Sequence, residues 1–465
     1  MSKVDHVKAS RSFIKDEPHI QFHDKRLWQI RSLRDQQAHG IPEWEQLREL
    51  ASRIKEHTLS NLADYLEEFE RKAIANGVVV HWAANAAEHN RIVHQLLSER
   101  GVDTLVKSKS MLTEECEMRP YLEARGIAVI ETDLGERIQQ LDDEMPSHIV
   151  IPAVHKLAKD VAEVFADTIG TDRSNDDPHY LAEGMRQDTR PYFLKSTAAG
   201  MTGCNFAVAE TGSVVVCTNE GNADLSANVP SLHIASIGIE KLIPRLEHLP
   251  VFIRMLSRSA IGSPITQYTS HFSAPKDGGE LHYVLVDNGR SERLAMDDFW
   301  YSLKCIRCGA CMNTCPVYRR SGGLSYGGVY AGPIGAIINP TFDLKKYSAL
   351  PFASTLNGSC SNVCPVKINI HEQIYKWRQI VVEQGQVSFI KKEAMKLAGK
   401  VLGDPKRYRQ LSEGAKTIGG LPRAFLYNPF NAWGKQRELP AAPKQTFHEW
   451  YAQNRNKDDQ PEGKA

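Results

Sequence analysis

Short apolar runs alternate with amphipathic segments between residues 77 and 165. The apolar runs are residues 78–80, 104–106, 127–130 and 148–151, and each has the length of a buried strand. Helical periodicity follows each run, in segments at about residues 85–101, 113–124, 137–141 and 154–165. Alternation at this spacing predicts βα units, and therefore a parallel sheet covered by helices on both faces.

The predicted strands follow one another more closely in the second part of this region. A polar segment with one helix is predicted at residues 171–195. Further strands are predicted at residues 206–209, 213–217, 233–237 and 284–286. Glycine- and asparagine-containing turns separate the strands, and helices are expected within residues 238–258. The pattern predicts an α/β domain over residues 71–290.

Residues 1–70 predict a helical arm before the first strand. The first 40 residues are polar, with one helix expected near residues 25–36. From Pro42, which suits a first helical position, apolar residues recur at helical spacing as far as Phe69. We interpret this stretch as a helix or helix pair that packs on the α/β domain.

A cysteine run follows the α/β region and indicates a metal-cluster site. Residues 305–316 read C-I-R-C-G-A-C-M-N-T-C-P, the C-x2-C-x2-C-x3-C-P pattern of bacterial ferredoxins. Thiolates two residues apart can wrap three corners of one iron–sulfur cubane, whereas the fourth cysteine points toward a second cluster. A second run, C-S-N-V-C-P at residues 360–365, repeats the same ending.

Zinc and disulfides are weaker interpretations of these runs. Structural zinc sites usually use two separated C-x2-C pairs, or cysteines with histidines. Cysteines at this spacing favour metal or redox chemistry in a reducing compartment over disulfides.

The segments around the runs predict a small helical module over residues 291–400. A short helix is expected at residues 297–304, and longer helices are expected at residues 371–385 and 387–401. Residues 321–340 are rich in glycine but lack a phosphate-binding motif, so we interpret them as a compact spacer. Residues 401–465 form a C-terminal extension with a polar end.

Charge and hydropathy exclude several classes of protein. The 465 residues include 57 basic and 56 acidic side chains, so the formal net charge of +1 gives no argument for nucleic acid binding. No run of 18 apolar residues predicts a transmembrane segment, and the polar N-terminus lacks a signal-peptide core. We expect a cytoplasmic protein, with any membrane association peripheral and made through partners.

Several motifs together resemble one family. They are K-S-K-S-M at 107–111, E-T-D-L-G-E at 131–136, T-G-C-N-F-A-V-A-E-T-G-S at 202–213, T-N-E-G-N at 218–222, V-D-N-G-R-S at 286–291 and the first cysteine run with V-Y after it. These motifs resemble the lactate utilization iron–sulfur proteins, the B subunits of the bacterial L-lactate oxidation system. The resemblance runs from about residue 40 to the end of the chain.

The resemblance implies a fold, a cofactor and partners. The fold would be a lactate-utilization domain akin to the sugar-phosphate isomerase and CoA-transferase group, followed by an α-helical ferredoxin domain. The cofactor would be a 4Fe-4S cluster, and the partners would be other subunits of the lactate oxidation complex and an electron acceptor. The complex would oxidise L-lactate to pyruvate, and this subunit would carry electrons without being catalytic alone.

The two-cluster pattern assigns ligands, and the second set is incomplete. The first cluster would take Cys305, Cys308, Cys311 and Cys364. The second would have only Cys315 and Cys360, because Ser354 and Asn357 stand where a complete run has cysteines. A cluster completed by other groups, a smaller cluster and no second cluster all remain open.

Two side chains are candidates to complete the second set. They are Ser354, through its oxygen, and Cys204, if the two domains meet. We interpret Cys116 and Cys217 as small buried hydrophobic residues.

Two further features have competing interpretations. Lys304 and Arg307 flank the first ligands and would favour a reduced, more negative cluster, unless both are simply solvated. Glu210 and Glu220 lie in turns that could form an acyl or anion site, which would make the α/β domain an enzyme acting on a carboxylate substrate. Glutamate beside glycine is also an ordinary turn residue.

Overall fold

The computed structural model describes residues 3–419 and 444–455, with side chains described as far as residue 414 and again from residue 444. The chain divides into two compact units, Met1–Glu383 and Gln384–Ala465. None of the helices formed by the described residues is long and apolar enough to span a membrane.

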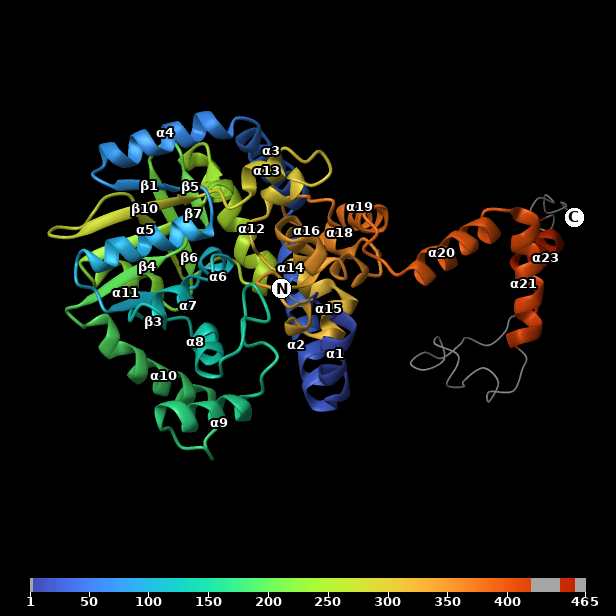
Figure 1. Ribbon diagram of the computed structural model, residues 1–465, viewed down its shortest axis with the longest axis horizontal. Coiled ribbons are helices and arrows are strands. Elements are labelled where there is room, and N and C mark those ends of the chain that lie inside the picture. Colours follow the sequence, from blue (N-terminus) through green and yellow to red (C-terminus); the bar gives the residue numbers. More distant parts are fainter. Residues whose placement is uncertain (1–2, 420–443, 456–465) are drawn as a thin grey trace, which may run out of the picture. The chain divides into compact units, whose positions relative to one another are not determined.

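A six-stranded sheet forms the centre of the first unit (Figure 1). Every neighbouring pair is parallel, which confirms the predicted α/β class. In spatial order the strands are β1 (Val79–Ala83), β10 (Glu280–Val286), β7 (Leu232–Gly238), β4 (Ala198–Thr202), β2 (Thr104–Lys107) and β3 (Ala128–Glu131).

Helices cover both faces of this sheet, as parallel strands require. One face packs against α5 (Ala86–Ser98), α6 (Met111–Glu115) and α7 (Met118–Glu123). The other face packs against α4 (Leu62–Ala75) and α10 (Pro178–Phe193). Asn85 caps α5 by accepting a hydrogen bond from the backbone N–H of Glu88, as its sequence predicts.

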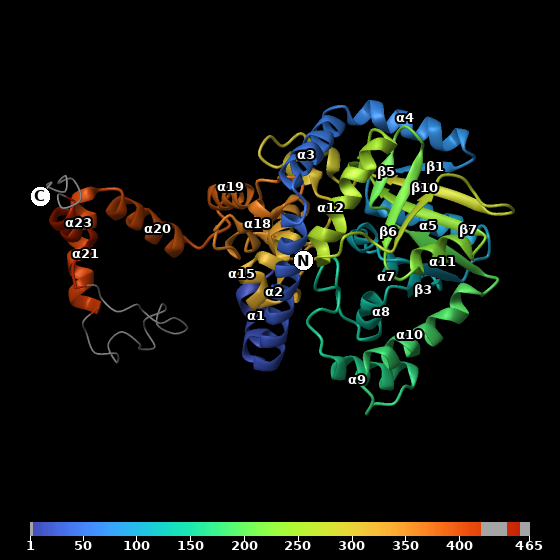
Figure 2. The same ribbon diagram turned by 180° about the vertical axis from the view of Figure 1, so that it is seen from behind.

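A second, four-stranded sheet was not expected from the sequence (Figure 2). Its spatial order is β8 (Leu242–Ile243), β5 (Phe206–Val208), β6 (Ser213–Thr218) and β9 (Tyr268–Phe272). Strands predicted at 206–209 and 213–217 therefore form, but in a separate antiparallel hairpin. Gly212 makes the tight turn with a φ of +63°, and an added Cβ would lie 2.3 Å from the backbone nitrogen of Ala73.

Three local predictions for the α/β domain were wrong. Residues 148–151 form no strand, because this apolar run packs against the first cysteine run instead. The helix expected at 113–124 is broken into α6 and α7 at Glu117, whose φ is +50°. Strand β1 lies at the sheet edge and is only partly buried, with Val79 47% exposed.

The N-terminal arm contains α1 (His6–Lys15), α2 (Glu17–His39) and α3 (Trp44–Ser60). The first 40 residues thus hold two helices where one was expected. Helix α2 packs against the helices that carry the first cysteine run, α14 (Ala310–Thr314) and α15 (Pro316–Ser321) (Figure 1, Figure 2).

The remaining elements of the first unit join these parts. In the α/β region they are α8 (Leu134–Leu141), α9 (Ala158–Ile169), α11 (Asn222–Asn228), η1 (Ile239–Lys241), η2 (Leu246–His248) and α12 (Leu249–Ile261). Around the cysteine runs they are α13 (Arg290–Leu294), η3 (Trp300–Lys304), η4 (Leu324–Tyr326), α16 (Gly332–Phe342), α17 (Leu344–Tyr347), η5 (Leu350–Phe352), α18 (Ser359–Val363) and α19 (Ile370–Glu383). The glycine-rich stretch is more than a spacer, because it contains the buried helix α16.

The second unit contains α20 (Phe389–Leu402), α21 (Pro405–Gly419) and α23 (Phe447–Asn454). Of the C-terminal extension predicted at residues 401–465, residues 420–443 and 456–465 lie outside the described residues.

Candidate metal centre

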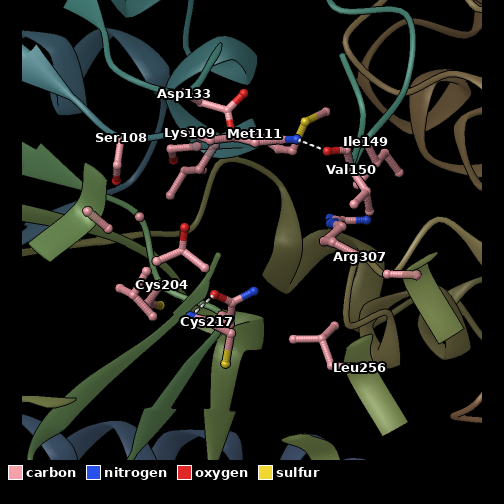
Figure 3. A pocket seen from close by; sticks show the side chains of 18 of the residues that line it. Ser108, Lys109, Met111, Asp133, Ile149, Val150, Cys204, Cys217, Leu256 and Arg307 are labelled. Carbon is pink, nitrogen blue, oxygen red and sulfur yellow. Dashed lines mark hydrogen bonds between the residues drawn. The ribbon is translucent and has the colours of Figure 1, made fainter. Parts of the chain in front are cut away.

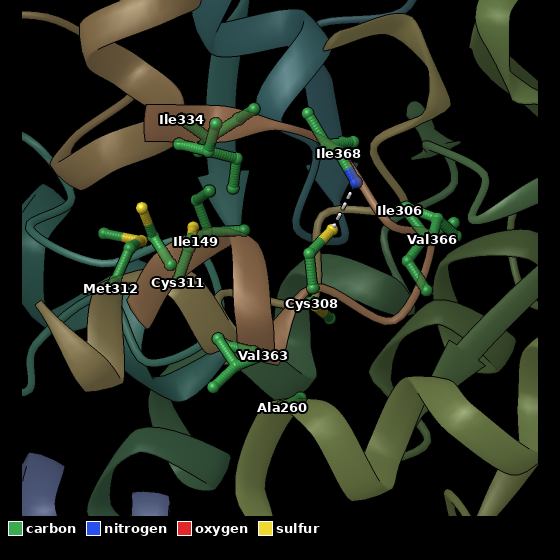
Figure 4. Close-up of a cluster of buried hydrophobic side chains, with 14 of the residues drawn as sticks. Ile149, Ala260, Ile306, Cys308, Cys311, Met312, Ile334, Val363, Val366 and Ile368 are labelled. Atoms are coloured by element: carbon green, nitrogen blue, oxygen red, sulfur yellow. Dashed lines mark hydrogen bonds between the residues drawn. The ribbon is translucent and has the colours of Figure 1, made fainter. Parts of the chain in front are cut away.

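Four thiols from the two cysteine runs line one small pocket. Figure 4 shows two of the cysteines, Cys308 and Cys311, among buried apolar side chains. Cys305, Cys308 and Cys311 come from the first run, and Cys364 comes from the second. Apolar side chains close the pocket around the sulfur atoms; among them are Ile149, Ile306, Ile334 and Ile368. The sequence prediction brought these four cysteines together, and the structure places them so.

The backbone turns the sulfur atoms inward. Arg307 and Gly309 both adopt positive φ angles, of 60° and 73°, which wraps the loop before α14. The backbone N–H of Arg307 donates to the Sγ of Cys305 at 3.4 Å, and that of Ile368 donates to the Sγ of Cys364 at 3.4 Å. Such N–H groups stabilise negative charge on ligating sulfur and tune the potential of a cluster.

The spacing of the thiols does not suit zinc. A Zn–S distance of about 2.3 Å places the sulfur atoms of a tetrahedral site about 3.8 Å apart. Among the described residues, the only set of three or more His, Cys, Asp or Glu ligand atoms within 4.8 Å of one another is Glu114, Glu131 and Glu136. No three of the described cysteine sulfur atoms therefore lie within 4.8 Å of one another, which is wider than a tetrahedral zinc site requires.

Burial keeps these thiols neutral unless a cation is bound. Burial raises the pKa of the Cys311 thiol well above its ordinary value, and the neighbouring thiols raise it further. Free thiolates are unstable in such a group, whereas iron ligation deprotonates the thiols and compensates their charge. The residues present thus fit a 4Fe-4S cluster.

Cys315 and Cys360 form a second, smaller group. Both are buried, and burial together with the nearby Cys315 thiol raises the pKa of Cys360 to about 12. Cys315 directly follows α14, Cys360 lies in α18, and these two helices pack together. Two thiols do not fill the four iron corners of a cubane, so this set alone does not fit that cluster.

The loop before α18 repeats the loop before α14, position for position. Leu356 and Gly358 have positive φ angles of 56° and 78°, as Arg307 and Gly309 do. The backbone N–H of Leu356 donates to the Oγ of Ser354 at 3.1 Å, the bond that Arg307 makes to a sulfur atom. Ser354 therefore occupies the place of the first cysteine of a run.

Asn357 occupies the place of the second cysteine of a run. Its side chain is exposed, and its Oδ1 accepts a hydrogen bond from the backbone N–H of Ser359 at 3.1 Å.

The two domains meet, but Cys204 lies on the side of the first group. It lines a cavity of the α/β domain together with Lys241, and Lys241 interacts electrostatically with both Cys204 and Cys305. Burial raises the pKa of Cys204 to about 12. The structure does not bring Cys204 to Cys315 and Cys360.

The two candidate glutamates are separated. Glu220 is exposed and lies at the edge of the same cavity, with its carboxylate accepting from the Thr218 hydroxyl at 2.9 Å. Glu210 does not line the cavity, and its carboxylate accepts from the backbone N–H of Leu246 at 2.9 Å.

Lys304 and Arg307 are not solvated. Lys304 is 1% exposed and donates to the Ser52 hydroxyl at 2.6 Å. The Arg307 side chain is 9% exposed, and its guanidinium lies 4.5 Å from the centre of the Tyr330 ring. Both cations are therefore poorly screened beside the cysteine pocket.

Two arginines of the N-terminal arm donate hydrogen bonds to the second cysteine run, and the sequence analysis did not identify them. Arg48 donates to the carbonyl oxygen of Cys364 at 2.9 Å and to that of Asn362 at 2.7 Å. Arg34 donates to the carbonyl oxygen of Val363 at 3.0 Å. Both arginines lie on polar positions of amphipathic helices, where solvent exposure is the ordinary expectation.

Comparison with known families matches both parts of the first unit. Residues 66–292 match the LUD domain, and residues 301–368 match the 4Fe-4S dicluster domain. The second match shows that the cofactors of this domain are 4Fe-4S clusters. No solved structure matches the chain.

Curated relatives match nearly the whole chain. A lactate utilization protein B of Geobacillus kaustophilus is 42% identical over 435 residues, which cover 90% of both chains. The corresponding protein of Geobacillus thermodenitrificans is 41% identical over 435 residues, again 90% of both chains. That of Shouchella clausii is 41% identical over 424 residues, or 88% of both chains.

Proposed function

The chain belongs to the lactate utilization protein B family, and on this premise we propose that it is the electron-transfer subunit of a complex that oxidises L-lactate to pyruvate. The observation that carries the proposal is the convergence of four thiols from both cysteine runs on one pocket. Because the sequence has no flavin or nicotinamide fingerprint, we assign the removal of hydride from lactate to a site on a partner subunit or to an unrecognised site.

The four cysteines hold the first cluster in this proposal. A 4Fe-4S cluster accepts and releases single electrons when bound. The chain contributes four thiolate ligands, two N–H donors to sulfur and an apolar wall that excludes water. The buried Arg307 and Lys304 favour the more negative, reduced state of the site.

The second site takes Cys315 and Cys360 in this proposal, with the Ser354 hydroxyl as the additional ligand. The loop of residues 354–358 already has the conformation of the loop that presents cysteines in the first run. We do not assign Asn357, because its amide oxygen caps the turn before α18.

The partners follow from the reaction. Oxidation of lactate to pyruvate releases two electrons, so a relay needs a subunit that donates electrons and an acceptor that removes them. We propose both as protein partners of this chain at the inner side of the membrane.

The proposal is tested by lactate-dependent reduction in the reconstituted complex. The visible absorbance of the oxidised clusters is followed anaerobically after L-lactate is added to this chain with its partner subunits. We expect bleaching with the wild-type chain and with Cys116→Ala, which removes a thiol distant from the pocket. Cys308→Ala should abolish most of the bleaching, and equal bleaching in Cys308→Ala would refute the relay.

A further inference from the structure

A cavity of about 210 Å³ lies at the carboxyl ends of the parallel strands (Figure 3). Ser108 follows β2, Gly203 follows β4 and Glu240 follows β7, and all three residues line it. Open parallel sheets bind their ligands at this edge. Glu220 and Asn219, which are exposed, also line the cavity, so it reaches the surface.

Three buried polar groups around the cavity have no partner among the described residues. They are the hydroxyls of Ser108 and Ser257, in side chains that are 3% and 2% exposed, and the Nη1 of Arg307. A buried polar atom without a partner costs about 1–3 kcal/mol. Three such atoms around one cavity indicate a ligand that satisfies them.

The cavity also carries positive charge that is not fully paired. Arg290 is held between the carboxylates of Glu115 and Glu240, whereas Arg307 reaches Glu240 only at 3.5 Å. Lys241 has no hydrogen bond or ion pair with any described residue, and burial lowers its pKa while Glu240 opposes that shift.

The acidic residues at the edge of the cavity are already engaged. Asp133 accepts from the backbone N–H of Glu136 at 3.1 Å, and Glu220 accepts from the backbone N–H of Asn219 at 3.2 Å. Three cations, Arg290, Arg307 and Lys241, thus share the two buried carboxylates of Glu115 and Glu240, and this excess of positive charge favours an anion inside.

One layer of residues separates this cavity from the first cluster pocket. Ile149 lines both spaces. Arg307 lines the cavity with its side chain and donates its backbone N–H to the Sγ of Cys305. Figure 3 shows Arg307 and Ile149 on the side opposite Ser108 and Cys204.

We propose that this cavity binds a short 2-hydroxy or 2-oxo carboxylate next to the first cluster. The carboxylate pairs with Lys241 and the Nη1 of Arg307, and the Ser108 and Ser257 hydroxyls bond to its oxygen atoms. The choice of this anion class rests on the proposed function in lactate oxidation, whereas the anion site itself rests on the cavity. No oxidation step is assigned to this site.

Isothermal titration calorimetry of the full-length, cluster-containing protein tests the site. L-lactate and pyruvate are titrated under anaerobic conditions, with acetate as an anion that lacks the 2-oxygen. We expect one saturable site per chain for at least one of the two acids, and weaker binding of acetate. Lys241→Met should weaken binding at least tenfold, whereas Lys345→Met, which removes an exposed lysine elsewhere, should leave it unchanged.

Two further measurements test the anion site without relying on Lys241→Met. Ser257→Ala removes an unpartnered hydroxyl, so it should retain its clusters and still weaken binding severalfold. A saturating acid should also alter the electron paramagnetic resonance (EPR) spectrum of the reduced first cluster. Equal binding in wild type, Lys241→Met and Ser257→Ala, or no binding of either acid to the wild type, would overturn the site.

Different results would refute the electron relay and the anion site. Clusters that are reduced by lactate in the complex, with no acid bound to this chain, would remove the anion site and leave the relay. Acid bound to a chain without iron would remove the relay and leave the anion site.

Discussion

The two cysteine loops share a backbone and differ in their ligands. Both have a positive φ two residues before a glycine with positive φ, then a five-residue helix, a cysteine and a proline. The first loop carries Cys305 and Cys308 where the second carries Ser354 and Asn357. The left-handed backbone at Leu356 therefore persists without the two thiols, so hydrogen bonds and packing are sufficient to hold it.

The surroundings of the two loops differ as well. The α/β domain encloses the first loop, where His148 contacts Asn313 at 3.0 Å and Ile149 covers the sulfur atoms. The N-terminal arm holds the second loop through arginine bonds to carbonyl groups. A loop can thus keep this shape through its neighbours without a complete set of cysteines.

The largest expected effect is a difference in iron content between variants of Cys364 and Cys360, two cysteines of the same short run. Cys364→Ala should remove the first cluster, because this thiol crosses to the pocket of the other run. Cys360→Ala should leave the first cluster in place. Iron and acid-labile sulfide are measured in both variants, and Cys364→Ala should lose about four irons per chain. Equal iron loss in the two variants would contradict the crossed arrangement.

Completing the second run should bring the second site to the full iron content of a cubane. In the double variant Ser354→Cys/Asn357→Cys, the second loop presents the same cysteines as the first, on a backbone that already has the matching conformation. Iron content should rise to about eight atoms per chain after anaerobic reconstitution. The single variant Ser361→Cys, placed outside the ligand pattern, should add none. Unchanged iron in the double variant would show that the two loops are not equivalent.

Removing an arginine of the arm should destabilise the second loop. Arg48→Met leaves the carbonyl groups of Asn362 and Cys364 without their charged donor, which should lower the free energy of unfolding by about 3 kcal/mol. Arg53→Met, an exposed site on the same helix, should change it by less than about 0.5 kcal/mol. Urea unfolding of the anaerobic protein measures both, and equal values would remove the structural role of Arg48.

The smallest effect concerns Ser354. Ser354→Ala removes one hydrogen bond to Leu356, so stability should fall by only about 1 kcal/mol. If the hydroxyl also ligates iron, the spectrum of the second site changes while that of the first does not. An unaltered spectrum would show that Ser354 stabilises the turn and does not ligate iron.

The alternation of strand and helix patterns predicted the parallel sheet, because each pattern is local. Carrying over the two-cluster ferredoxin pattern predicted that Cys364 joins Cys305, Cys308 and Cys311. The mixed second sheet was not predictable, since β8 and β9 pair with strands distant in the sequence. The run at residues 148–151 has a strand-like composition, but its apolar side chains cover the cysteine pocket. Arg48 and Lys241 carry no signal in one sequence, because burial of a charged side chain depends on tertiary packing.

Low-temperature EPR of the anaerobic, dithionite-reduced protein tests the central claim most directly. The account predicts a signal from the first cluster of about one spin per chain, which disappears in Cys364→Ala and persists in Cys360→Ala. A reconstituted protein without any such signal, and without acid-labile sulfide, would contradict the assignment of this chain as an electron relay.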